Sequence, residues 1–68
     1  MDMNPIGKFE MREIIREFEN TLIRLYGVNM LDAAISRYEA LGIYNEFRCA
    51  QTAAAVCGQR KGLDLQAA

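Results

Sequence analysis

The sequence contains no histidine and no tryptophan, and only one proline and two cysteines among its 68 residues. Without histidine, the chain has no side chain whose ordinary pKa lies near neutral pH, so general acid–base catalysis is a poor expectation. Two cysteines are too few for a disulfide-rich scaffold, and a chain that is 51% hydrophobic is not typical of disorder. We therefore expect a folded protein that is not an enzyme.

Long hydrophobic runs are also absent. The longest uninterrupted apolar stretch runs from Ala53 to Cys57, far short of the roughly 20 residues that a membrane-spanning helix needs. The first residues have neither the basic nor the apolar region of a secretory signal. These features predict a cytoplasmic protein that has no membrane partner.

The two cysteines, Cys49 and Cys57, are eight residues apart. On one helix their Cα atoms would lie about 12 Å apart, whereas an intrachain disulfide needs less than about 7 Å. Zinc ligands come in closer pairs, and two cysteines supply half a site at best. We expect two reduced packing residues, no metal and no cofactor, while an interchain disulfide stays open.

The apolar residues that are present follow helical spacing. Asn4 can cap a helix whose first position is Pro5, and the pattern predicts a helix over about 5–26. One face carries its apolar residues: Met11, Ile14, Ile15, Phe18, Leu22, Leu25 and Tyr26. The charged residues are sorted by sign, with Glu10, Glu13 and Glu17 on one flank and Lys8, Arg12 and Arg16 on the other.

A turn over 27–29 should follow the first helix. Gly27 suits a helix end, and Asn29 with Asp32 three residues later is a variant of the capping box. The second helix is predicted over about 30–41, with an apolar face of Leu31, Ala34, Ile35, Tyr38 and Leu41. A link of two or three residues would force an antiparallel helical hairpin.

The apolar phase changes at Gly42, because Ile43, Tyr44 and Phe47 do not continue the preceding stripe. One interpretation, which we favour, is a break or kink near Gly42 and a third helix over about 43–57. The other is a continuous helix with two apolar faces. Residues 59–68 read as a flexible polar tail, and the whole chain, 1–68, as a single domain.

A single hairpin has only one interface between helices, which is too little to bury this many apolar residues. The predicted fold is therefore all-α, with two hairpins forming a four-helix-like bundle. A two-fold homodimer is the commonest such solution. Its core would contain Met11, Ile14, Phe18, Leu22, Leu25, Leu31, Ile35 and Tyr38. The alternative is a monomer that buries its spare face on a different protein.

A protein partner is the favoured expectation. Aromatic residues are enriched at interfaces, and the residues around Gly42 that we predict as apolar anchors are Leu41, Ile43, Tyr44 and Phe47. Glu10, Glu13 and Glu17 would steer the chain toward a basic surface, such as one that normally binds DNA phosphates. The plainer interpretations are a core around the kink and a solvated helix flank.

Nucleic acid is the less favoured partner. Residues 34–54 can be fitted to a helix-turn-helix with Gly42 in the turn and Arg48, Gln51 and Thr52 on the reading helix. Arg60 and Lys61 would be further contacts to nucleic acid after that helix. Tyr38 is bulky for its place in that motif, however. The reading helix is alanine-rich and has one cation, too few to supply the usual electrostatic affinity. A small DNA- or RNA-binding regulator therefore remains the alternative function.

In size, in the Gly27-Val28-Asn29 turn and in its spare apolar face, the chain resembles small phage-encoded helical inhibitors of host proteins. These include quorum-sensing anti-activators and some anti-CRISPR proteins. Its layout is also similar to the helical-hairpin dimers that regulate plasmid copy number. The resemblance covers roughly residues 5–57. It implies a dimer that binds and inhibits a host protein, for example a transcription factor, and it transfers no site residues.

Overall fold

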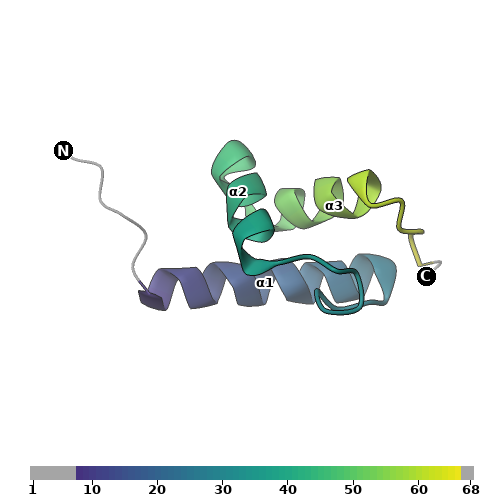
Figure 1. The fold of residues 1–68 in the computed structure, drawn as a ribbon, viewed down its shortest axis with the longest axis horizontal. Coiled ribbons are helices and arrows are strands. Elements are labelled where there is room, and N and C mark those ends of the chain that lie inside the picture. Colours follow the sequence, from purple (N-terminus) through teal and green to yellow (C-terminus); the bar gives the residue numbers. More distant parts are fainter. Residues whose placement is uncertain (1–7, 67–68) are drawn as a thin grey trace.

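The computed structural model describes residues 8–66 and contains α1 (Lys8–Tyr26), α2 (Arg37–Phe47) and α3 (Ala50–Arg60). These residues form no strand, so the all-α class is confirmed. The cap predicted at Asn4 and Pro5 lies outside the described residues. In Figure 1, α1 forms the base, α2 stands across it, and α3 lies beside the C-terminal half of α1.

The end of α1 is confirmed at Tyr26. Gly27 follows with φ +74°, a conformation that glycine adopts without a Cβ clash. Its N–H donates to the carbonyl oxygen of Ile23 at 2.8 Å, which satisfies one of the last carbonyls of the helix.

The second helix predicted over 30–41 was wrong in its first part. The Asn29 side chain does accept a hydrogen bond from the backbone N–H of Asp32 at 2.7 Å, but the turn that it caps does not propagate. Ala34 takes φ +58°, and the N–H of Ile35 donates back to the Met30 carbonyl at 2.9 Å. The chain therefore closes a turn over 30–35 instead of extending a helix.

Helix α2 begins only after Ser36, whose hydroxyl oxygen accepts the backbone N–H of Glu39 at 3.1 Å. Serine followed three residues later by glutamate is the usual capping-box pattern, and it is a stronger start signal than Asn29 with Asp32. The connection from α1 to α2 thus spans residues 27–36, not the two or three residues predicted.

The break predicted near Gly42 was also wrong, because α2 passes through this residue and continues to Phe47. The chain turns instead at Arg48, which takes φ +59° and donates its N–H to the Tyr44 carbonyl. Cys49 then precedes α3 as its N-terminal cap residue. The third helix predicted over 43–57 is therefore divided between α2 and α3.

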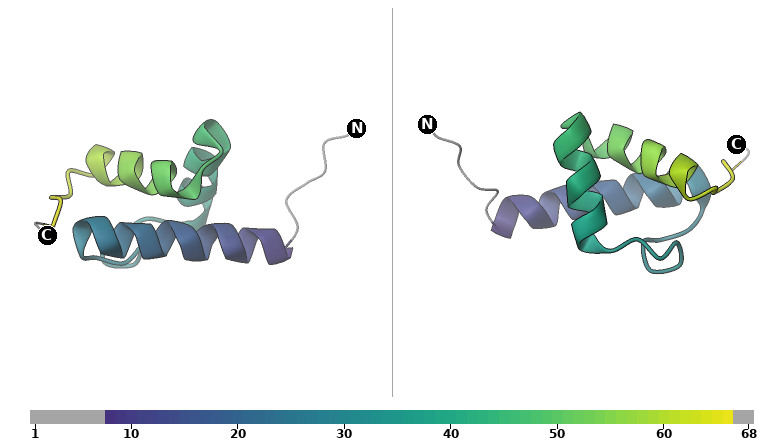
Figure 2. Two further views of the ribbon diagram at one scale, coloured as in Figure 1. Left: turned by 180° about the vertical axis from the view of Figure 1, so that it is seen from behind. Right: turned by 45° about the horizontal axis from the view of Figure 1, so that its top comes forward.

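Helices α1 and α3 run side by side in the same direction, which the two views of Figure 2 show from behind and from above. Ala50, at the start of α3, lines a groove with Glu17, while Gly58, near its end, contacts the ring of Tyr26. An antiparallel hairpin is therefore not the arrangement observed. Helix α2 is the crossover between two helices that share a direction.

One hydrophobic core lies between the three helices. Its buried residues are Phe18, Leu22, Tyr26, Met30, Ile35, Ala40, Ile43, Ala50, Ala53, Ala54 and Cys57. Alanines on α3 permit a close approach to α1, as shown by the Tyr26 hydroxyl, which donates to the Ala55 carbonyl oxygen at 2.7 Å. A single chain therefore encloses this core.

The residues predicted for a dimer core divide into three groups. Phe18, Leu22 and Ile35 are buried within the single chain, and Met11, Ile14 and Leu25 are half-buried. Leu31 and Tyr38 are 85% and 86% exposed, so they lie outside the core of the single chain. Leu31 lies in the turn that replaces the predicted helix, and helical spacing does not apply there.

The tail predicted from residue 59 contacts the rest of the fold at Leu63 and Gln66, while the other described residues after Gly58 are exposed. Helix α3 extends to Arg60, and Leu63 packs against the core. The backbone N–H of Gln66 donates to the Leu25 carbonyl at 2.7 Å, and its side-chain amide donates to the Tyr26 carbonyl at 3.2 Å. These contacts cover the end of α1.

Replacing Gly58 by alanine should destabilise the fold, because the new Cβ would overlap the ring of Tyr26. We expect Gly58→Ala to lower the free energy of unfolding by about 3 kcal/mol, as overpacked cores do. Urea unfolding followed by circular dichroism measures the change.

The matched control is Gly42→Ala. Gly42 lies in the middle of α2 with no atom near its would-be Cβ, so this variant should gain about 0.5–1 kcal/mol. A neutral Gly58→Ala would contradict the packing of α1 on α3.

Candidate binding surfaces

The crossing of α2 over α1 leaves two grooves, one on each flank of the N-terminal half of α1. The first, here called the junction groove, lies where α1 meets the end of α2 and the start of α3. Its lining consists of Glu13, Ile14, Glu17, Tyr44, Arg48, Cys49, Ala50 and Gln51. Two carboxylates and one guanidinium give this groove a net negative charge.

The junction groove brings together three of the seven residues predicted to bind a partner. Glu13 and Glu17 reach it from α1, and Tyr44 reaches it from α2. Neither carboxylate forms an ion pair with a described residue. Glu10 is exposed on α1 but does not line the groove.

The other predicted anchors do not form one patch. Ile43 is only 7% exposed and belongs to the core, so it was wrong as a partner-binding residue. Helix α2 turns Ala40 and Ile43 toward α1 and α3, which leaves Leu41 half-buried and Phe47 38% exposed. Neither Leu41 nor Phe47 lines the junction groove.

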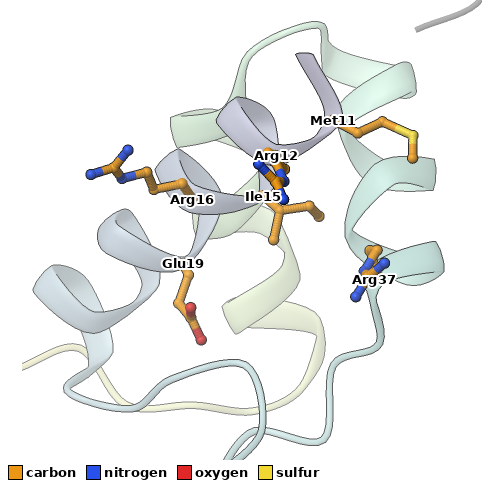
Figure 3. A pocket seen from close by; sticks show the side chains of 6 residues that line it. All are labelled: Met11, Arg12, Ile15, Arg16, Glu19 and Arg37. Carbon is orange, nitrogen blue, oxygen red and sulfur yellow. The ribbon is translucent and has the colours of Figure 1, made fainter. Parts of the chain in front are cut away.

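The second groove, here called the arginine groove, lies on the opposite flank of α1 next to the start of α2. Its lining consists of Met11, Arg12, Ile15, Arg16, Glu19 and Arg37. Figure 3 shows Arg16 and Arg37 on opposite sides, with Arg12 and Ile15 between them. The charge pattern of α1 already groups Arg12 with Arg16 on one flank. Arg37 lies 21 residues after Arg16, so only the folded chain brings it to the same groove.

Glu19 is the one acidic residue of the arginine groove, and its carboxylate is already engaged. Its Oε2 accepts the backbone N–H of Met30 at 3.0 Å. Figure 3 shows its side chain directed away from Arg12. Glu19 therefore fixes the segment after α1 against this flank.

Two further cations connect α3 with α2 and its preceding turn. Lys61 pairs with Glu39 at 3.3 Å and donates to the Ala34 carbonyl at 3.2 Å, and Arg60 lies 3.9 Å from Glu46. These pairs neutralise the positive charge at the end of α3.

The two free thiols occupy different environments. Cys49 is exposed at the start of α3, and its pKa is lowered mainly by the Thr52 hydroxyl, then by the backbone N–H groups of Thr52 and Gln51. Cys57 lies in the core, where burial raises the pKa of its thiol. Cys49 is therefore the more reactive of the two.

Among residues 8–66, no three histidine, cysteine, aspartate or glutamate side chains are grouped so that they could hold a metal ion. No described helix is both long and apolar enough to cross a membrane. No family model matches the chain, and comparison with curated proteins and with solved structures gives no match.

The thiol environments predict selective alkylation by iodoacetamide at neutral pH. A lowered pKa leaves more thiolate, so Cys49 should react quickly, and Cys57 only as fast as the chain unfolds. Thr52→Val should slow the Cys49 reaction, because it removes the hydroxyl that favours the thiolate. Mass spectrometry of the labelled peptides measures both rates, and equal rates for the two cysteines would contradict this assignment.

Proposed function

We propose that this chain is a non-enzymatic interaction module that modulates or inhibits a regulatory protein by stoichiometric binding. The observation that carries the proposal is the junction groove, which all three helices line and where Glu13 and Glu17 of α1 lie beside Tyr44 of α2. Its partner is a basic segment of another protein.

The chemistry of the groove supports a partner of that kind. Lysine and arginine side chains can pair with these two carboxylates, which lie one helical turn apart on α1 and are not in ion pairs with other described residues. Tyrosine supplies contact area with few rotatable bonds and is typical of binding hot spots. A basic surface covered in this way could no longer contact nucleic-acid phosphates, which is how binding alone would inhibit a transcription factor.

A DNA- or RNA-binding regulator is the second candidate, and one observation favours it. Helices α2 and α3 are joined by only Arg48 and Cys49, and α2 stands across α3 as in a helix-turn-helix. The charges support it less well. Arg60 and Lys61 pair with glutamates of α2, which leaves α3 with little positive charge for phosphates.

The interaction module predicts that a basic amphipathic peptide binds the chain with an affinity that falls as salt rises. Reversing both charges in Glu13→Lys/Glu17→Lys should weaken binding about tenfold, since exposed ion pairs each contribute up to about 1 kcal/mol. Fluorescence anisotropy of the labelled peptide measures the affinity.

The matched control is Asp32→Lys/Asp64→Lys, because both aspartates are exposed and lie outside the junction groove. An equal loss of affinity in this control would mean that the peptide responds only to net charge, and the proposal would then be wrong.

We also propose a homodimer, which now needs a surface other than the core. Leu31 and Tyr38, the most exposed large apolar side chains among the described residues, are the candidates for that contact. Light scattering should give twice the 7.7 kDa mass of the chain. Leu31→Ser/Tyr38→Ser should reduce the mass to that of one chain without loss of helix, whereas a monomeric parent protein would contradict the dimer.

A further inference from the structure

We infer that the arginine groove is a second binding surface, and that its occupant is an acidic amphipathic segment of a partner protein. The inference goes beyond the proposed function, because this groove lies on the other flank of α1 and has the opposite charge. It rests on two features of the groove, its charge and its apolar floor.

The charge of the groove is positive and uncompensated. Arg12 and Arg16 lie one turn apart on α1, and Arg37 reaches the groove from α2. Within the described part of the chain, none of these guanidiniums forms an ion pair or a hydrogen bond. The only carboxylate present, that of Glu19, is held by the Met30 N–H. Guanidinium groups pair with carboxylates in a two-pronged geometry.

The floor of the groove is apolar. Met11 and Ile15 are half-buried and belong to the N-terminal end of the apolar stripe of α1. Helix α3 begins beside Glu17 and therefore covers the stripe only from about that position onward. Ile15 packs partly against the core, and the exposed parts of Met11 and Ile15 can accept aliphatic side chains from another molecule.

Charge and floor together favour an acidic protein segment over a nucleic acid. Three cations provide little of the electrostatic affinity on which nucleic-acid binding depends, and the whole chain has a net charge of −1. Phosphates would leave Met11 and Ile15 without apolar contact. An amphipathic acidic helix satisfies both features, because its carboxylates reach the rim while its leucines cover the floor.

The test uses the full-length chain and a labelled peptide of about 14 residues, roughly four helical turns, in which glutamates flank a leucine stripe. A matched peptide has glutamine in place of each glutamate. We expect the acidic peptide to bind and the glutamine peptide to bind at least about tenfold more weakly. Raising the salt concentration should reduce this difference.

Variants locate the site. Arg16→Glu and Arg37→Glu should each weaken binding about fivefold. Arg37 is the first residue of α2, where an acidic side chain favours the helix, so this variant should keep its fold. Met11→Ser should weaken binding without a change in charge. Arg24→Glu makes the same charge change on α1 outside the groove and should leave the affinity within about twofold.

Four results would overturn the inference. The first is no binding of the acidic peptide at about 1 mM, and the second is a loss of affinity in Arg24→Glu equal to that in Arg16→Glu. The third is displacement of the peptide by a DNA or RNA oligonucleotide at a concentration lower than that of the peptide. The fourth is conversion of a dimer to a monomer by Arg16→Glu. The last two would identify a nucleic acid or a second copy of the chain as the occupant. None of these variants alters the junction groove, so failure here is distinguishable from failure of the proposed function.

Discussion

The contact between Tyr26 and Gly58 determines how closely α1 and α3 pack, and the rest of the fold depends on that distance. The ring lies where a Cβ on residue 58 would be, and its hydroxyl reaches the Ala55 carbonyl. Because the facing residues of α3 are small, Phe18 and Leu22 are fully enclosed by one chain. Two helices that run in the same direction need a crossover, and α2 provides it by standing across α1.

The crossover also determines where the charged flanks of α1 can act. On one flank, Glu13 and Glu17 line the groove at the junction of α2 and α3; on the other, Arg12 and Arg16 line a groove with Arg37, the first residue of α2. Each flank alone would be a solvated helix surface. Helix α2 adds Tyr44 to the acidic flank and Arg37 to the basic flank, and so turns each flank into a groove. Two grooves of opposite charge therefore lie on either side of α1.

Local signals predicted the parts of the fold in which neighbouring residues decide the conformation. Gly27 ends α1 because a left-handed residue is needed there, and helical spacing gives the buried face that contains Phe18 and Leu22. The start of α2 was misplaced because two capping signals compete, and the one at Ser36 produces the helix. Ile43 was predicted on the surface because its direction was compared with the apolar face of a helix assumed to begin near residue 30. Helix α2 begins only at Arg37, so most of that face does not exist.

The sequence by itself determined the all-α class, the end of α1 and the separation of acidic from basic residues on that helix, since each depends on residues within a few turns of one another. Only the tertiary structure decided that α3, not α2, lies along α1, that Ile43 is buried while Tyr38 is exposed, and that Arg37 joins Arg12 and Arg16. Those outcomes depend on the direction in which the chain leaves the turn at Ala34 and on the close approach at Gly58. The turn at Ala34 is local, but its positive φ has no counterpart in helical spacing. The approach at Gly58 is a contact with Tyr26, a residue distant in sequence, which periodicity does not encode.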